Sequence, residues 1–406
     1  MKKASLIVCL IVAATILYGR ALPASEHAEP AVEVAPVVEV SRPGDKPLVQ
    51  IAILLDTSGS MSGLIDQARA ELWSLVNEFI FARQQGRQPE VQVALYEYGK
   101  SSLATEVGHI RRIVPLTTDL DRISEELFAL KTRGGNEYCG WVIKDATADL
   151  KWSDSPSDLK VIFIAGNEPF TQGPADYRQA CKAAVEKGII VNTIHCGSEA
   201  DGLSGEWKDG AVLADGRYLN IDQNRQITHI PAPQDEEIAE LGVRLNQTYI
   251  AYGRQGQALH ERQAVQDKNA VQASPEAALQ RVVAKSSSNY MNTHWDLVDA
   301  INAQQVDLGQ IETEELPEEM QKMNADERKA YVEAKAKERA SIQVRIQQLN
   351  DQRSRFIANE MKKQQQDGDT LGSAAKQVIR EQGQRKHFTF TPAVGTPGVE
   401  AGTAEH

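Results

Sequence analysis

Cysteine is scarce in this chain, with four in 406 residues, and no C-x-x-C pair occurs. The chain therefore has too few cysteines for a small fold held together by disulfides, and it lacks the cysteine pair that indicates a structural zinc site. Basic residues are outnumbered by acidic ones, 44 to 56, which gives a net charge of −12. An acidic chain with no local basic face repels phosphate backbones, so we expect no nucleic-acid partner.

The composition also excludes a protein with many membrane spans, because 41% hydrophobic and 25% charged residues are ordinary globular values. The one long apolar run, from Ala4 to Tyr18, follows two lysines and precedes small residues up to Ala24. This pattern predicts a secretory signal peptide over residues 1–24, and hence export to the periplasm or the extracellular space. A retained anchor remains the alternative, although it needs roughly 20 apolar residues to cross a bilayer. We expect no membrane span after cleavage.

Short apolar runs alternate with helical stretches from residue 48 to about residue 254. The run at 50–55 is almost continuous, as expected for a strand covered on both faces. A helical stripe at 64–79 follows it. Such alternation predicts a doubly wound α/β domain with parallel strands, long enough to fold alone. Within it, the glycine-containing segment 197–222 predicts turns and a hairpin at the rim of the sheet.

The segments on either side of this domain differ from it in composition. We predict a linker rich in Pro, Glu, Ala and Val at 25–47, a polar helical or linker region at 255–311, a charged helix or coiled coil at 312–366, and a largely disordered tail at 367–406. The charged helix carries only a partial apolar seam. Self-association as a coiled coil and a solvated helical hairpin are therefore both open.

Asp56, Ser58 and Ser60 come directly after the first predicted strand, in the sequence DTSGSMSG. Ligands bind to open α/β sheets at the carboxyl ends of the strands. A carboxylate and two hydroxyls are hard oxygen donors, which Mg²⁺ prefers. The alternative is a plain turn in which Ser62 caps the next helix. We favour the metal site, because the motif follows a buried strand and opens a long amphipathic helix.

These residues, the order of strands and helices, and the glycine pair at 134 and 135 resemble a von Willebrand factor type A domain with its metal-ion-dependent adhesion site. The resemblance covers about residues 48–254. It implies a mostly parallel six-stranded sheet and binding of other macromolecules through Mg²⁺, with Mn²⁺ or Ca²⁺ as alternatives. Asp56, Ser58 and Ser60 match the first ligand loop of the family.

The other two ligand loops of this family depart from its pattern here. Asn136 stands where the family has threonine, and its carbonyl can replace the threonine hydroxyl as a ligand. Gly166 stands where the third loop has aspartate, and Glu168 is the nearest acid that follows it. The predicted site is therefore Asp56, Ser58, Ser60, Asn136 and Glu168. We expect weaker metal binding than in the family, because fewer anions reach the ion.

No catalytic constellation accompanies this site. Gly99, Lys100 and Ser101 resemble the end of a phosphate-binding loop but lack its first glycine. The hydrolase motif G-x-S-x-G is absent around Ser58 and Ser60. The neighbours His195 and Cys196 should face opposite sides of a strand. We therefore predict a protein that is not an enzyme and has neither catalytic residues nor an organic cofactor.

The prediction that combines these observations is an exported protein-binding module of bacterial type. An acidic residue of its protein partner would complete the coordination of the cation. One alternative is an assembly scaffold of the cell envelope with a degenerate metal site. Another is an accessory subunit of a metal-inserting or ATP-driven complex.

Two further residue types leave alternatives open. After signal cleavage the chain keeps Cys139, Cys181 and Cys196, which allow one disulfide with one thiol left over, or three buried thiols. Trp207 in the loop-rich segment is either an exposed contact residue or a hydrophobic plug, and we favour the plug.

Overall fold

The computed structural model describes residues 46–222, 224, 229–364 and 371–390. They belong to one compact unit that begins at Lys46. The predicted signal peptide, most of the predicted linker and the last part of the predicted tail lie outside the described residues. Within these ranges, no helix combines the length and the apolar character that a membrane crossing requires.

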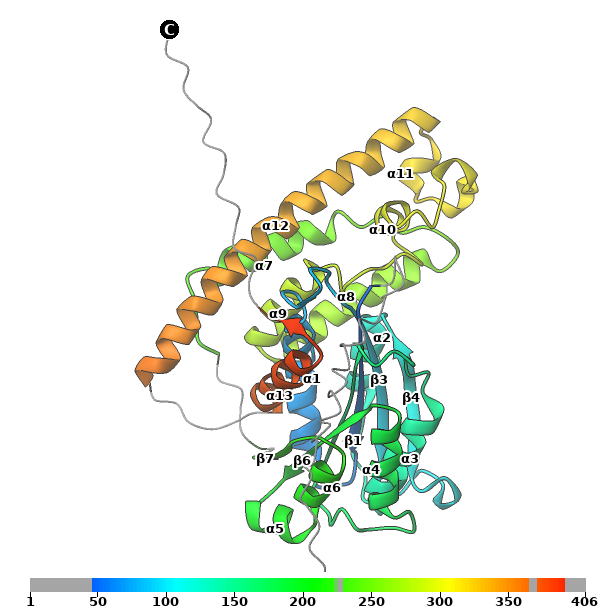
Figure 1. Cartoon of the computed structure of the whole chain (residues 1–406). Coiled ribbons are helices and arrows are strands. Elements are labelled where there is room, and N and C mark those ends of the chain that lie inside the picture. Colours follow the sequence, from blue (N-terminus) through cyan, green and yellow to red (C-terminus); the bar gives the residue numbers. More distant parts are fainter. Residues whose placement is uncertain (1–45, 223, 225–228, 365–370, 391–406) are drawn as a thin grey trace, which may run out of the picture. The chain divides into compact units, whose positions relative to one another are not determined.

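A six-stranded sheet forms the centre of the unit, in the order β4-β3-β1-β5-β6-β7 (Figure 1). All neighbouring strands are parallel except β3 and β4, which are antiparallel. The strands of this sheet are β1 (Leu48–Asp56), β3 (Glu90–Tyr98), β4 (Ile110–Thr117), β5 (Leu159–Gly166), β6 (Ile190–Cys196) and β7 (Tyr218–Ile221). The predicted doubly wound, mostly parallel six-stranded sheet is thereby confirmed.

Helices cover both faces of this sheet, which is why the central strands β1 and β5 read as nearly continuous apolar runs. In β1, Ile51 and Leu55 join one hydrophobic core, while Ala52 and Leu54 join the other. The first core lies against α1 (Ser62–Asn77), α2 (Leu120–Ala129), α7 (Asp235–Asn246) and α9 (Pro275–Lys285). The second lies against α3 (Cys139–Asp149), α4 (Tyr177–Glu186) and α6 (Trp207–Leu213).

The segment between β6 and α7 differs from its prediction. The sequence predicted turns and a hairpin at 197–222, but this part of the chain forms α5 (Glu199–Ser204), α6 and the parallel strand β7. The predicted hairpin was therefore wrong. Short polar helices and an edge strand carry too little periodicity to be told from turns by pattern alone.

The helical region after residue 254 packs directly on the sheet domain. It contains α8 (Gly256–Ala273), α9, α10 (Leu297–Asn302), α11 (Glu318–Gln321) and α12 (Ala325–Gln364). Two short 3₁₀ helices, η2 (Leu308–Gln310) and η3 (Thr313–Glu315), lie in the same region, and a third, η1 (Thr105–Val107), lies between β3 and β4. The predicted domain boundaries remain predictions, including the independent folding of 48–254.

The partial seam of the charged helix faces this chain's own core. Ile342, Ile346 and Leu349 of α12 are buried in the first hydrophobic core. The basic seam residues Arg339 and Arg353 are also buried, and each pairs with acids of neighbouring segments. The seam therefore has an intramolecular partner, whereas a coiled coil with a second chain remains a proposal.

A last helix, α13 (Leu371–Arg385), and a short strand, β8 (Phe388–Thr389), follow where the sequence predicted a largely disordered tail. β8 pairs with β2 (Arg83–Gln84) in an antiparallel two-stranded sheet. Gln382 of α13 exchanges two hydrogen bonds with Asn192 of β6, at 3.1 and 2.7 Å. Tail composition alone was thus misleading for residues 371–390, because buried contacts with the domain order them.

Candidate metal centre

The first predicted ligand loop lies at the carboxyl end of β1. Asp56, the last residue of β1, is fully buried, and its Oδ1 accepts a hydrogen bond of 2.6 Å from the backbone N–H of Ser58. The Ser58 hydroxyl donates to Asp56 Oδ2 at 3.1 Å and lies 3.3 Å from the Ser60 hydroxyl. α1 starts at Ser62 with no side-chain cap, so Ser62 does not play the capping role of the alternative interpretation.

The second loop brings a carboxylate to Asp56 that the sequence analysis did not select. Glu137 is buried, with 3% of its surface exposed, and its side chain lies within hydrogen-bonding reach of Asp56 and Ser58. Both acids flank Gly99: a Cβ built there would lie 2.5 Å from Asp56 Oδ1 and 2.8 Å from Glu137 Cγ. Asn136, the predicted ligand of this loop, is exposed. The structure therefore brings Glu137 to Asp56 and leaves Asn136 at the surface.

The electrostatics of this carboxyl pair are unusual. Burial, and next the neighbouring Glu137, raise the pKa of Asp56 well above its ordinary value. Burial likewise raises the pKa of Glu137. Among the described residues, no Lys, Arg or His forms an ion pair with either acid. Nearby Glu97 differs, because Lys100 lies 3.2 Å and Arg111 2.5 Å from its carboxylate.

The third loop, after β5, supplies no buried carboxylate. A Cβ at Gly166 would lie 2.5 Å from the Tyr98 hydroxyl and 3.2 Å from Asp56 Cβ. Tyr98 donates to the Ala165 carbonyl at 3.0 Å and so occupies the space that a side chain at Gly166 would need. Any larger residue at Gly166 would have to displace this tyrosine, which gives the departure from the family pattern a physical reason.

Asn167 and Glu168 complete the third loop at the exposed rim. The Ser60 hydroxyl donates to Asn167 Oδ1 at 3.4 Å, which links the first and third loops. The Glu168 side chain is exposed, while its backbone N–H donates to Glu137 Oε2 at 3.3 Å. Glu168 is therefore held beside the site by its backbone, and its carboxylate lies at the surface.

These residues fit a divalent cation. Two buried carboxylates without a basic partner need either a shared proton or a cation, because ionising both in an apolar setting is costly. The hydroxyls of Ser58 and Ser60 add hard oxygen donors of the kind that Mg²⁺, Mn²⁺ and Ca²⁺ accept. No cluster of three or more His, Cys, Asp or Glu residues suited to a metal occurs in the described ranges. A cation here would therefore depend on hydroxyl oxygens and water as well as on acids.

The remaining candidate residues are structural. His195 is buried and contacts Asn220 Oδ1 at 3.0 Å, and it has a ring contact with Trp207. Trp207 is fully buried and donates to the Glu168 carbonyl at 2.8 Å, so its prediction as a plug is confirmed. Cys139, Cys181 and Cys196 are free and buried, which matches the three-thiol alternative rather than a disulfide.

This geometry defines a class of domain: a doubly wound α/β fold with an acid- and hydroxyl-lined site at the carboxyl edge of its sheet. Residues 50–203 match the family described as von Willebrand factor type A domain. This part of the chain is therefore similar to a von Willebrand factor type A domain, and its mostly parallel six-stranded sheet with helices on both faces agrees with that match.

Several solved structures resemble the chain at low identity. BatB from Bacteroides thetaiotaomicron is 19% identical, with 43% of this chain and 90% of that chain covered and a TM-score of 0.32. The SpRpn10 VWA domain is 18% identical over 44% of this chain and 90% of that chain, with a TM-score of 0.33. An aerotolerance-related membrane protein from Bacteroides fragilis is 16% identical over 43% of this chain and 93% of that chain, with a TM-score of 0.30. No curated protein matches the chain.

Glu137 is absent from the ligands predicted from the sequence, although its position in the sequence could have indicated it. It directly follows the three residues Gly134, Gly135 and Asn136 that define the second loop, and it is the one acid between residues 127 and 144. Position in a loop does not tell which side chain points inward, and the family pattern indicates Asn136 because this residue stands where the family has its threonine ligand. The rule that metal ligands are preferably acidic would have indicated Glu137 as the ligand from this loop.

Proposed function

We propose that this chain is an exported, non-enzymatic protein-binding module that holds a divalent cation at the carboxyl edge of its sheet. Asp56, Ser58, Ser60 and Glu137 are the residues that would hold the ion, with Mg²⁺ favoured and Mn²⁺ or Ca²⁺ as alternatives. The observation that carries the proposal is the buried pair of Asp56 and Glu137, neither of which has a basic partner in the part of the chain that the structure describes. Export rests on the sequence pattern of residues 1–24.

The chain's own residues orient the donor atoms. The Ser58 N–H and hydroxyl each bond one oxygen of Asp56, so this carboxylate is fixed before any ion binds. Ser60 is exposed and is held by Asn167. When bound, the cation supplies positive charge at the surface with positions open to outside oxygens. We propose that an acidic residue of a partner protein takes one of them, and we keep Asn136 and Glu168 as predicted ligands, direct or through water.

Calorimetric titration of the full chain with MgCl₂, MnCl₂ and CaCl₂ tests the cation site. We expect saturable binding of at least one ion, which Asp56→Asn abolishes. The matched control is Asp66→Asn, because this acid lies on α1 with a side chain 72% exposed. Absence of binding for all three ions, or undiminished binding by the Asp56 variant, would overturn the proposal.

A second candidate is an assembly scaffold whose metal site has degenerated. The observation that favours it is Gly166, where the Tyr98 hydroxyl takes the space of a third acid. This candidate predicts that a chelator changes neither stability nor partner binding. Capture of envelope proteins with and without chelator, followed by mass spectrometry, distinguishes the two candidates.

A further inference from the structure

The loop at 131–136, between α2 and α3, is firmly held beside the candidate metal centre. Arg69 of α1 donates to the Leu130 carbonyl at 2.8 Å, which fixes the start of the loop. The Arg133 backbone N–H donates to the Thr57 carbonyl at 2.9 Å, and the Ser101 N–H donates to the Gly134 carbonyl at 2.8 Å. The loop thus has no regular secondary structure but is tied to the first ligand loop and to the turn after β3.

This loop presents two basic side chains at the rim. Lys131 and Arg133 are both exposed, and neither side chain has an ion pair or hydrogen bond with another described residue. Nearby basic residues are already paired: Lys100 and Arg111 contact Glu97, and Arg122 lies 2.7 Å from Glu126. The backbone of Arg133 is therefore held in place, and its exposed guanidinium group is available to an outside group.

The position of Arg133 relates it directly to the site. Its own backbone is bonded to Thr57, which lies between the ligands Asp56 and Ser58. A partner whose carboxylate reaches the cation would therefore bring its neighbouring residues close to Arg133. A guanidinium group presents a planar set of donors that matches a carboxylate.

We propose that Arg133, assisted by Lys131, binds a second carboxylate of the same partner. The preferred partner is then an acidic protein segment with two acidic side chains near each other, one at the cation and one on Arg133. This inference rests on the proposed function for its first carboxylate. The net charge of −12 does not prevent such binding, because salt screens charges beyond about 8 Å at physiological ionic strength.

Selection from a random peptide library tests the inference. The immobilised full chain is screened in MgCl₂, with counter-selection on Asp56→Asn. We expect the selected peptides to carry two neighbouring acidic residues. Arg133→Gln should weaken binding of such a two-acid peptide about fivefold. Its binding of a peptide with a single acid should stay unchanged. Arg133→Lys should keep part of the preference for two acids over one. Arg87→Gln, which changes an arginine before β3 at the opposite end of the sheet, is the matched control.

The outcomes separate the inference from the function on which it rests. If the unaltered chain binds Mg²⁺ but selects peptides with one acid, or if Arg133→Gln binds the two-acid peptide as tightly as the unaltered chain, the inference alone is overturned. If the unaltered chain binds none of the three divalent ions in the calorimetric titration, the proposed function fails and this inference fails with it.

Discussion

At the scale of single residues, charge burial governs the candidate metal centre. A carboxylate removed from water is destabilised, and a second carboxylate beside it adds repulsion. Asp56 and Glu137 combine both effects, with exposed fractions of 0% and 3%. The folded chain therefore keeps two groups together at a cost in stability, which a bound cation would relieve.

Glu137→Gln tests this arrangement. The substitution removes one buried charge, so we expect the variant to melt at the same temperature as the unaltered chain or higher in EDTA, and to lose most of the stabilisation by Mg²⁺. For the unaltered chain that stabilisation is about 2.7 kcal/mol when Mg²⁺ is present at 100 times its Kd. Thermal unfolding with and without MgCl₂ provides the measurement.

Asn136→Ala is the matched variant for the same loop. Because the Asn136 side chain is exposed, we expect its Mg²⁺ stabilisation to stay close to that of the unaltered chain. The reverse result, with a large loss for Asn136→Ala and none for Glu137→Gln, would restore the ligand predicted from the family pattern and contradict the placement of Glu137.

A second group of charges, centred on the buried Arg353, connects α7, α9 and α12. Arg353 of α12 lies 2.6 Å from Asp235 and 2.6 Å from Glu276. Burial alone would raise the pKa of Glu276, but hydrogen bonds and charge from Arg353 outweigh it and lower this pKa from 4.5 to about 2. The folded chain therefore binds this proton more weakly than the unfolded chain, so the ion pair stabilises the fold above about pH 4.5.

Glu276→Gln should accordingly destabilise the chain at pH 7, by about 3 kcal/mol from the change in pKa. The difference from the unaltered chain should shrink as the pH falls from 4.5 toward 2, because Glu276 is then protonated in both states. Urea unfolding at a series of pH values measures this. Glu240→Gln is the control, because Glu240 is an exposed acid on α7. A loss of stability in Glu276→Gln that is the same at all pH values would contradict the lowered pKa of Glu276.

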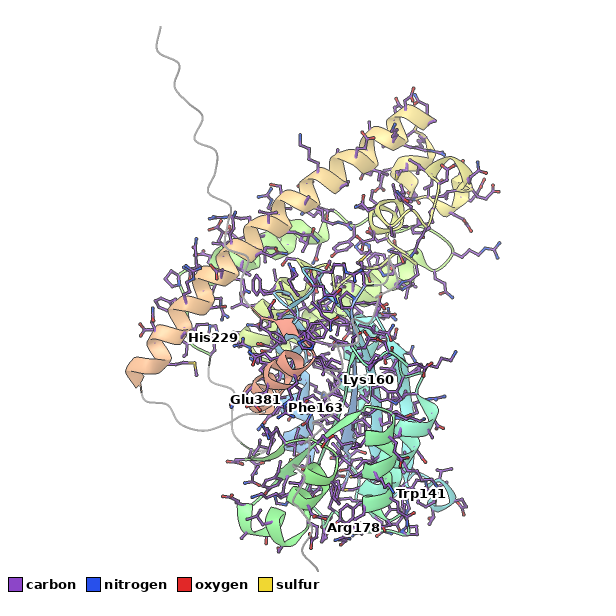
Figure 2. All side chains as sticks on the ribbon, in the orientation of Figure 1. Trp141, Lys160, Phe163, Arg178, His229 and Glu381 are labelled. Carbon is purple, nitrogen blue, oxygen red and sulfur yellow. The ribbon has the colours of Figure 1, made fainter. Side chains whose placement is uncertain are left out.

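At the scale of elements, α13 belongs to the sheet domain although α8 to α12 separate it from the strands. Ala375 and Ile379 line an apolar cavity of about 40 Å³ together with Phe163 of β5 and residues of α1. Polar contacts add to this packing, since Arg217 lies 3.0 Å from Glu381 and Arg380 pairs with Glu78. Figure 2 labels Phe163 on the sheet and Glu381 on α13.

Ile379→Ala tests the contribution of α13. The side chain is fully buried and borders the cavity, so its removal enlarges a void that the surroundings fill only in part. We expect a loss of about 2–5 kcal/mol in the free energy of unfolding, measured by urea denaturation. Gln377→Ala on the exposed side of α13 should change this free energy by less than about 0.5 kcal/mol. Equal effects of the two substitutions would mean that α13 is not docked.

How far the sequence predicted these elements depends on the kind of signal. β1 and β5 are strongly apolar because both of their faces are buried, and the pattern indicated them correctly. α13 was missed because its order comes from contacts with residues far away in the chain, such as the contact of Gln382 in α13 with Asn192 in β6. The candidate metal centre shows the same difference. Asp56 and Ser58 could be predicted as neighbours because they belong to one loop, but Glu137 could not, because its approach to Asp56 depends on tertiary packing.

At the scale of the whole molecule, the helices after residue 254 complete the first core rather than form a separate body. Leu279 and Val283 of α9 and Ile379 of α13 belong to that core. The Arg281 guanidinium is buried 2.7 Å from the buried Asp121 of α2 and lies over the Trp73 ring of α1. Without residues after 254, Asp121 would lose this partner and α1 would expose apolar surface.

Truncation to residues 46–254 therefore tests the boundary that the sequence predicted. Since a buried carboxylate deprived of its partner costs about 3–5 kcal/mol, and the lost apolar contacts add to that, we expect the fragment to unfold without a cooperative transition. Fragment 46–390, which keeps α9 and α13, should unfold cooperatively and serves as the control. Urea denaturation followed by tryptophan fluorescence and by circular dichroism measures both fragments. Coincident, cooperative transitions of 46–254 at a midpoint near that of 46–390 would show that the domain folds alone, as its composition and length predicted, and that the helical region adds only surface.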